Sequence, residues 1–334
     1  LLQILGLPGQ CAGGFVSGAT MASFTALAAA RHALLGRAGW NVEEDGLFGA
    51  PPIDVVVGEE VHVSVLKALG LLGLGRRRVV RVPVDGQGRM RVEALPRMNA
   101  LTIVCTQTGN VNTGAFDDLT EICARARDVD AWVHVDGAIG LWAAAAPSLS
   151  HLTAGLAEAD SWATDAHKWL NVPYDSGLAL VKNRQSLRAA MAFSRAAYLA
   201  AGGGREAARF TPELSRRARG IEVWAALRSL GRRGLADLLE RNCAQARRFA
   251  QGLARAGFSI LNEVVLNQVL VSFGSADRTR RVVKAVQEDG TCWCGPTEWH
   301  GLTAMRISVS SWATTDSDVE RSLAAIVNIA KRTD

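Results

Sequence analysis

The first half of the chain alternates short apolar runs with longer segments in which hydrophobic residues recur at helical spacing. Residues 20–35 form an alanine-rich helical pattern, and residues 118–127 place apolar side chains on one helix face. Short strands interleaved with helices favour a largely parallel sheet that is covered on both faces. The expected strands are 53–57, 79–82, 101–106, 132–136, 161–164 and 178–181.

The pattern changes after the glycine run at residues 202–204. Long arginine-rich amphipathic helices come next, followed by an alternation of strands and helices that is typical of a smaller α+β domain. We therefore expect a large domain at residues 1–220 and a small C-terminal domain at 221–334. Its expected elements are helices at 221–230 and 235–256, a strand at 264–273, a helix at 278–289, a strand at 304–309 and a helix at 316–330.

Composition excludes several classes of protein. The 334 residues are 49% hydrophobic and 21% charged, which provides a packed core and rules out wholesale disorder. The net charge is only +5 and the basic residues are scattered, so we expect no nucleic-acid partner. No apolar run is long enough for a membrane span, and the first six residues lack the basic start of a signal peptide.

The cysteines do not predict a disulfide scaffold or a metal centre. Six cysteines are too few for such a scaffold at this length, and a reducing, cytoplasmic setting is the expectation. Cys292 and Cys294 precede His300, but a zinc site needs four ligands and no fourth is evident. Buried free thiols are the preferred interpretation, and we predict no metal.

A candidate phosphate site lies at the start of the alanine-rich helix. Residues 17–20 offer backbone amides at the positive end of that helix, and Thr20 adds a hydroxyl. This segment alone favours the alternative interpretation, an ordinary helix cap.

An aspartate and a lysine follow two of the expected strands. Asp136 ends a strand at the edge where α/β sheets bind ligands, and a buried carboxylate there needs a cationic partner. Lys168 stands between His167 and Trp169, where partial burial and neighbouring positive charge activate an amine as a Schiff-base nucleophile. The alternatives are a structural ion pair or helix cap for Asp136 and a snorkelling side chain for Lys168.

The three segments together predict a pyridoxal phosphate site. They supply a phosphate cradle, an anion for the ring nitrogen and an amine for the aldehyde. In this interpretation Asp136 keeps the ring nitrogen protonated, which makes the ring an electron sink. His62 is then a candidate to stack on the ring; an ordinary helix-cap or core histidine is the alternative.

Three motifs resemble those of the group II pyridoxal-dependent decarboxylases, which include aromatic amino acid, tyrosine and glutamate decarboxylases. Residues 164–170, TDAHKWL, resemble the lysine motif of this family. Residues 134–138, HVDGA, resemble its ring-nitrogen strand, and residues 17–22 resemble its phosphate turn. The resemblance continues into residues 305–315 and covers essentially the whole chain.

The resemblance implies the α/β fold of the PLP-dependent aminotransferases, fold type I. That fold has a large domain with a mostly parallel seven-stranded sheet and a small α+β C-terminal domain. It implies an obligate homodimer with shared active sites and a small-molecule amino acid as substrate. Only sixteen residues precede Ser17, so most of the N-terminal segment of the family is expected to be missing.

The resemblance also implies a role for individual residues. Lys168 forms the Schiff base with pyridoxal phosphate, Asp136 partners the ring nitrogen, and His62 and Ala138 lie on the two ring faces. The implied reaction decarboxylates an L-amino acid to the amine and carbon dioxide through a quinonoid. Further cofactor contacts are implied for Ala19, Thr20, Asn110, Asn112, Asp165 and His167. Asp165 stands where animal aromatic decarboxylases carry asparagine, and a carboxylate repels a phosphate unless it is protonated or bridged.

One departure from the family bears on the product. Aromatic decarboxylases carry a loop tyrosine, and its place here is at or near Ala207, where no tyrosine stands. Tyr198 or His167 is the alternative acid, and Arg306 either binds a carboxylate or packs structurally. The alternatives are an aldehyde-forming decarboxylase-oxidase, another PLP lyase on the same scaffold, and a catalytically silent truncated paralogue.

Overall fold

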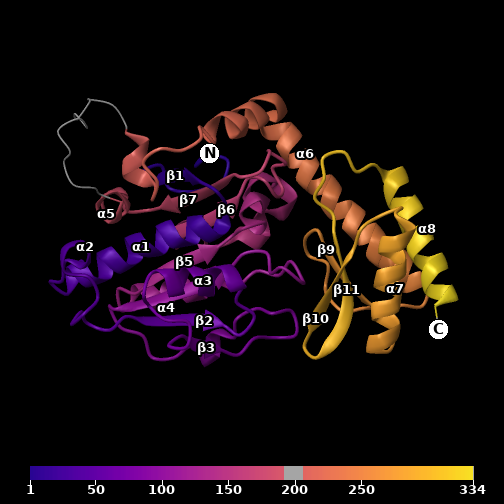
Figure 1. Cartoon of the computed structure of the whole chain (residues 1–334), viewed down its shortest axis with the longest axis horizontal. Coiled ribbons are helices and arrows are strands. Elements are labelled where there is room, and N and C mark those ends of the chain that lie inside the picture. The colour runs from indigo at the N-terminus through magenta and orange to yellow at the C-terminus, as the bar shows by residue number, and fades with distance from the viewer. Residues whose placement is uncertain (192–205, 334) are drawn as a thin grey trace. The chain divides into compact units, whose positions relative to one another are not determined.

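The computed structural model describes residues 1–191 and 206–333, which form two compact units (Figure 1). The first unit comprises Leu1–Thr108 and Phe116–Arg232, and the second comprises Gly109–Ala115 and Arg233–Asp334. The sequence placed a boundary after residue 220, whereas the units divide after Arg232. At Gly231, inside helix α6 (Gly220–Arg255), φ is 62°, a left-handed conformation that glycine tolerates and that interrupts the helix.

The first unit is built on a seven-stranded sheet in the order β1-β7-β6-β5-β4-β2-β3. Neighbouring strands from β6 to β3 pair in parallel, while β7 pairs antiparallel with both β6 and β1. The mostly parallel α/β sheet is therefore confirmed. The strands are β1 (Ala12–Val16), β2 (Asp54–Gly58), β3 (Val80–Val82), β4 (Thr102–Gln107), β5 (Trp132–Asp136), β6 (Ser161–Asp165) and β7 (Gly177–Val181).

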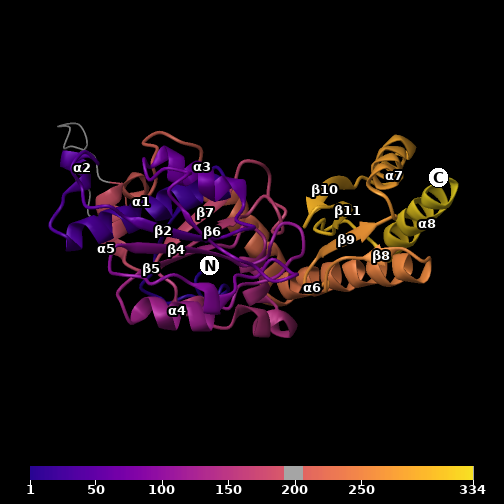
Figure 2. The ribbon, with the colours of Figure 1, turned by 90° about the horizontal axis from the view of Figure 1, so that it is seen from below.

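Helices cover both faces of this sheet. Helices α1 (Ala19–Arg37) and α3 (Val63–Leu71) lie on one face, and α4 (Leu119–Arg127) lies on the other (Figure 2). The buried side chains of α1 and α3 share one core with β2 and β4, which holds this layer on the sheet. Two shorter helices, α2 (Val42–Asp45) and α5 (Arg184–Ala190), also belong to the described part of this unit.

Strand β1 was not expected from the sequence, because its residues AGGFV include two glycines. The structure explains them by close backbone approach. A Cβ atom on Gly14 would lie 2.2 Å from the carbonyl oxygen of Phe210, and one on Gly13 would lie 2.5 Å from a methyl carbon of Leu180. The chain then leaves β1 and enters α1 through Ser17 and Gly18.

The second unit holds a four-stranded antiparallel sheet in the order β10-β11-β9-β8. Its core combines this sheet with the later part of α6 and with α7 and α8. Its elements after α6 are β8 (Ser259–Ile260), β9 (Gln268–Ser272), α7 (Ala276–Asp289), β10 (Gly295–Trp299), β11 (Leu302–Ser308) and α8 (Asp316–Arg332). Of these, β8 and β10 were not expected: β8 has two residues, and β10 is an edge strand that tolerates Pro296. No helix in the described ranges is long and apolar enough to cross a membrane.

Candidate active site

The carboxyl ends of two neighbouring parallel strands bring two carboxylates and a lysine to one edge of the sheet. Asp136 ends β5, Asp165 ends β6, and the two strands pair in register with Asp136 opposite Ala163. Lys168 follows in the turn after β6, and its Nζ lies 2.8 Å from Oδ2 of Asp165. Of the Lys168 side chain, 36% is exposed, so a ligand can reach the amine.

Asp165 links this edge to the start of helix α1. Its Oδ1 accepts a hydrogen bond of 2.6 Å from the backbone N–H of Ala19, and the carboxylate is almost completely buried. Gly18 precedes the helix and contributes no side-chain cap. The helix is therefore capped by a residue 146 positions away, which is why no local cap at residues 17–20 is found. The negative charge lies at the positive end of α1.

His167 is held by the segment that leads into β7. Its Nδ1 accepts a hydrogen bond of 3.1 Å from the backbone N–H of Ser176. The neutral ring therefore carries its proton on Nε2, which lies 3.4 Å from Oδ1 of Asp165. The ring of Tyr174 stacks on His167 with 4.2 Å between the centroids. These contacts fix His167 as a support for the Asp165 carboxylate.

Asp136 is a buried carboxylate that interacts electrostatically with two other predicted site residues. Burial raises the pKa of Asp136, and the charges of His62 and then Lys168 act against that rise. The backbone N–H of Ala138 donates to Oδ1 of Asp136 at 3.1 Å. The structure thus brings Asp136, His62, Lys168 and Ala138 into one electrostatic neighbourhood.

His62 lies at the N-terminus of helix α3 and acts as its cap. The backbone N–H of Ser64 donates to Nδ1 of His62 at 3.3 Å, and the Ser64 hydroxyl lies 2.7 Å from the same atom. Nδ1 is therefore an acceptor, and the neutral ring carries its proton on Nε2. The helix-cap interpretation of His62 holds, and it is compatible with a ring face turned to a ligand.

The surroundings of Lys168 differ from the expectation in one respect. The sequence predicted neighbouring positive charge around this amine, because His167 precedes it in the chain. In the structure the group in contact with Nζ is the Asp165 carboxylate, and His167 directs its Nε2 to the same carboxylate. The expectation was wrong because residues adjacent in sequence turn their side chains to a shared anion.

Three further predicted residues lie in the second compact unit. Asn110 is 2% exposed; its Oδ1 accepts the N–H of Asn112, and its Nδ2 has no hydrogen-bond partner among the described residues. Oδ1 of Asn112 accepts the Thr297 hydroxyl at 2.8 Å. Arg306 donates to the carbonyl oxygen of Val111 at 3.3 Å, which is the structural contact that the sequence left open.

The structure describes Ala207, the expected place of the loop tyrosine, but not the alternative acid Tyr198. Ala207 begins a short 3-10 helix, Ala207–Phe210, in which no tyrosine stands. Tyr198 lies outside the described residues.

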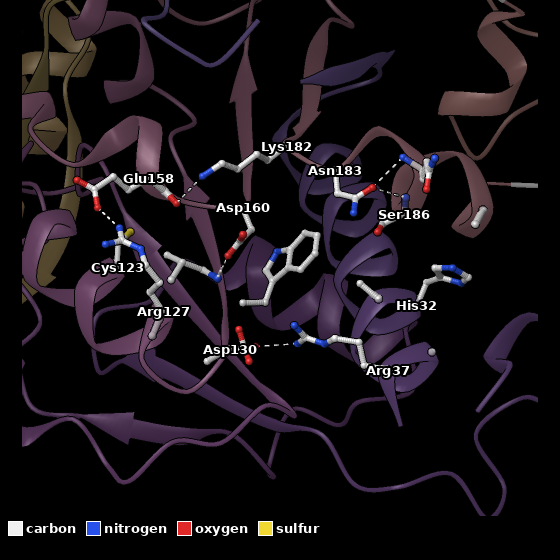
Figure 3. A pocket seen from close by; sticks show the side chains of 18 residues that line it. His32, Arg37, Cys123, Arg127, Asp130, Glu158, Asp160, Lys182, Asn183 and Ser186 are labelled. Atoms are coloured by element: carbon white, nitrogen blue, oxygen red, sulfur yellow. Dashed lines mark hydrogen bonds and ion pairs between the residues drawn. The ribbon is translucent and has the colours of Figure 1, made fainter. Parts of the chain in front are cut away.

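A cavity of about 720 Å³ opens at the opposite edge of the first unit's sheet (Figure 3). Its lining includes the first residues of β5 and Lys182 after β7, so a full strand length separates it from Asp136. Its charged groups bond within the protein: Nζ of Lys182 donates to the Glu158 carbonyl oxygen, Arg37 donates to two carbonyl oxygens, and Asp160 accepts a backbone N–H. The volume alone therefore does not make it the better candidate.

The sequence model of the family described as "Pyridoxal-dependent decarboxylase conserved domain" matches residues 1–274. The chain belongs to this family. An aromatic-L-amino-acid decarboxylase of Bacillus atrophaeus is 32% identical over 243 residues, which cover 69% of this chain and 48% of that protein. An L-2,4-diaminobutyrate decarboxylase of Rhizobium meliloti is 30% identical over 295 residues, which cover 83% of this chain and 56% of that protein.

Solved structures support the same fold. The structure described as Oryza sativa TDC with PLP and tryptamine has a TM-score of 0.90 at 20% identity and covers 100% of this chain and 74% of that one. Mouse CSAD gives a TM-score of 0.88 at 22% identity, covering 98% of this chain and 73% of that one. These likenesses confirm fold type I. The chain spans about half the length of the first curated relatives it matches.

The site fits the cofactor of the pyridoxal-dependent decarboxylases, pyridoxal phosphate. Asp136 forms no ion pair with any described residue, which leaves its buried charge for a protonated ring nitrogen. Two buried hydroxyl oxygens at this edge, Oγ1 of Thr108 and Oγ of Ser176, have no hydrogen-bond partner in the described ranges. Buried polar atoms of this kind are normally satisfied, so a polar ligand is the expected partner.

Sequence reasoning missed several residues that shape this decarboxylase-family site. Ser176 positions His167 through its backbone N–H, and Trp142 donates its indole N–H to the carbonyl oxygen of Asp165 at 2.9 Å. A Cβ atom on Gly177 would lie 2.5 Å from Cα of Gly18, so two glycines let β7 pass next to the start of α1. None carries a local motif; only the number of glycines around β1 and β7 hints at close packing.

Proposed function

We propose that this chain is the catalytic part of a decarboxylase that converts an L-amino acid to the amine and carbon dioxide with pyridoxal phosphate. The observation that carries the proposal is the convergence of Lys168, Asp136 and His62 at the carboxyl edge of β5 and β6. An accessible amine that pairs with the buried carboxylate of Asp165 and also acts electrostatically on the buried Asp136 supports this chemistry.

Pyridoxal phosphate supplies an aldehyde that condenses with amines and a pyridinium ring that accepts the electron pair of a breaking bond. In our proposal Asp136 keeps the proton on the ring nitrogen, because a buried carboxylate is stabilised by a cation beside it. Lys168 would hold the cofactor through its accessible amine. His62 and Ala138 would bound the cofactor ring on its two faces.

The start of helix α1 is the proposed phosphate site. Ala19 and Thr20 provide the helix N-terminus and a hydroxyl, and Asp165 already occupies the Ala19 N–H. A phosphate bound there would therefore share this helix end with the Asp165 carboxylate. It would have to displace this carboxylate, bind when the carboxylate is protonated, or be joined to it by a bridging cation. Lys168 Nζ and His167 Nε2 are the cationic or proton-bearing groups that face Asp165.

Proton transfer to the product requires a group with a proton at the site. We propose Nε2 of His62, because Nδ1 is used by Ser64 and Nε2 carries the proton of the neutral ring. His167 is less suited, since its Nε2 is directed at Asp165. Asn110 is proposed to contact the cofactor through its unpartnered amide, with Asn112 as its support.

Oligomeric state and location follow the family expectation and remain part of the proposal. We propose a homodimer that shares its active sites and acts in the cytoplasm on a free amino acid. The large cofactor-binding domain is proposed at residues 1–220 and the small domain at 221–334.

The test is decarboxylation by the purified chain supplied with pyridoxal phosphate and each of the twenty amino acids. Release of amine and carbon dioxide in equal amounts is expected with a subset of them. Lys168→Ala should abolish the reaction, whereas Lys182→Ala, a lysine of the opposite cavity, should keep it. Aldehyde together with peroxide as the products, or undiminished turnover by Lys168→Ala, would contradict the proposal.

A further inference from the structure

Two cysteines of the second unit are placed close together outside the proposed active site. Cys292 and Cys294 lie in the segment between α7 and β10, which belongs to no helix or strand. Both thiols contact the core of this unit, whereas Trp293 between them is 76% exposed. Alternating directions are typical of extended backbone, and they put the two thiols on the same side.

The two thiols interact directly, and their environments make them unequal. Cys294 is buried and is hydrogen-bonded to the sulfur of Cys292, and Ser322 on α8 also bonds to Cys292. The hydrogen bond from Cys294 is the largest cause that lowers the pKa of Cys292, to about 7, while burial and the nearby Asp289 act in the opposite direction. The same hydrogen bond and burial raise the pKa of Cys294.

We propose that Cys292 and Cys294 form a peroxide-sensitive dithiol that closes reversibly to a Cys292–Cys294 disulfide. Cys292 is half-buried and reachable, so it is the attacking thiolate, and Cys294 is the resolving thiol held against it. The chemical class of the oxidant is a hydroperoxide. The proposal does not depend on the decarboxylase activity.

The reaction balances in two steps. The Cys292 thiolate attacks one peroxide oxygen, the O–O bond breaks, and after protonation the products are a sulfenic acid and water or an alcohol. The Cys294 sulfur then attacks the Cys292 sulfur, the S–O bond breaks, and a second water leaves with the thiol proton. Two electrons pass from the two thiols to the peroxide.

The geometry allows this bond with a small backbone movement. Cα atoms two residues apart in extended chain are roughly 6.6–6.8 Å apart, and bridged cysteines are usually about 5.5–6 Å apart with an upper limit near 6.8 Å. A shortening of the segment by about 1 Å would therefore bring the Cα atoms to the usual separation. Gly290 with φ 75° precedes it and has open space around it, so the chain can adjust there. A bond formed under such strain is readily reduced.

Cys11 is a matched control in the same molecule. It is also half-buried, but burial raises its pKa, and it belongs to the first unit. Trypsin should release residues 1–31 and 285–306 as separate peptides, the first holding Cys11 alone and the second holding Cys292 and Cys294 alone. Both sites can therefore be followed in one digest of the full chain.

The experiment treats the 334-residue chain with hydrogen peroxide, blocks remaining thiols with iodoacetamide and analyses the peptides by mass spectrometry. Peptide 285–306 should lose two hydrogen atoms and regain them after dithiothreitol, while peptide 1–31 stays reduced. Uptake of two alkyl groups by peptide 285–306 after peroxide, or addition of oxygen without loss of hydrogen, overturns the proposal.

Alkylation rates and variants test the assigned roles. At pH 7 Cys292 should react with iodoacetamide several-fold faster than Cys11, since the lowered pKa of Cys292 and the raised pKa of Cys11 give Cys292 the larger thiolate fraction, partly offset by its lower nucleophilicity. Ser322→Ala should slow Cys292 alone. The Cys294→Ser variant should accumulate oxygenated Cys292, and the Cys292→Ser variant should leave Cys294 reduced. Equal reactivity of Cys292 and Cys11, or a disulfide-like mass loss in either variant, would contradict the assigned roles.

Discussion

Replacing Asp165 by asparagine separates two effects that the wild-type carboxylate combines. Asp165 caps α1 through the Ala19 N–H at 2.6 Å and holds the Lys168 amine at 2.8 Å. Asparagine keeps an acceptor for the Ala19 N–H but loses the negative charge. The variant should therefore be less stable without cofactor and better able to bind an anion at the start of α1.

The two magnitudes can be worked from these contacts. The charge at the helix N-terminus contributes about 0.3–1 kcal/mol and the partly exposed pair with Lys168 about 0.2–1 kcal/mol, so Asp165→Asn should cost roughly 0.5–2 kcal/mol of unfolding free energy. Two unit charges 4 Å apart repel by about 4 kcal/mol at an effective dielectric constant of 20. Allowing for screening, the affinity for a phosphate should rise by at least about tenfold, or 1.4 kcal/mol.

Binding of inorganic phosphate and of pyridoxal phosphate should be measured by calorimetry on the cofactor-free chain. Phosphate reports on the helix end alone, because it has no aldehyde to react with Lys168. Asp160→Asn is the control, since that partly buried carboxylate lines the cavity at the opposite edge and its replacement should leave both affinities unchanged. Weaker phosphate binding by a folded Asp165→Asn would refute the reasoning and make the carboxylate part of the anion site.

Three other predictions concern single residues. Gly177→Ala places a Cβ atom 2.5 Å from Cα of Gly18 and should destabilise the chain by about 1–3 kcal/mol in urea unfolding; an unchanged midpoint would contradict the close approach. Burial raises the pKa of Asp117 to about 6, so the free energy of unfolding should fall by roughly 3 kcal/mol as pH rises from about 4 to 6 and the carboxyl ionises. Asp117→Asn should flatten this pH dependence in unfolding curves recorded at pH 4.5 to 7.5, and an equal slope in the variant would contradict the raised pKa. His62→Phe should keep pyridoxal phosphate affinity within a few-fold but lower the turnover rate at least about tenfold, and wild-type turnover would exclude His62 as the proton donor.

Local pattern was enough to predict the parts of the fold in which each strand or helix is determined by its own residues. Strand β5 was predicted with its observed bounds, because a short run that contains the apolar residues Trp132, Val133 and Val135 ends at Asp136, before a glycine. Helix α1 was predicted within a few residues of its observed ends, because its alanine-rich sequence has a helical pattern. The position of Asp136 at a carboxyl strand end, and hence its nearness to Lys168, followed from the parallel order of β5 and β6.

Contacts between distant segments could not be predicted in this way. The cap of α1 comes from Asp165, and no spacing rule connects Ala19 to a residue 146 positions later. Residues 109–115 belong to the second unit through contacts such as the hydrogen bond from the Thr297 hydroxyl to Oδ1 of Asn112, which joins residues 185 positions apart. Strand β1 was hidden because its glycines serve tertiary approach rather than strand propensity.

The most direct test of the central claim is to load the chain with pyridoxal phosphate, reduce it with borohydride and map the lysine that retains the cofactor. We predict a single modified site at Lys168, no modification of Lys182, and loss of the adduct in Lys168→Ala. Attachment at another lysine, or equal attachment in Lys168→Ala, would contradict the account.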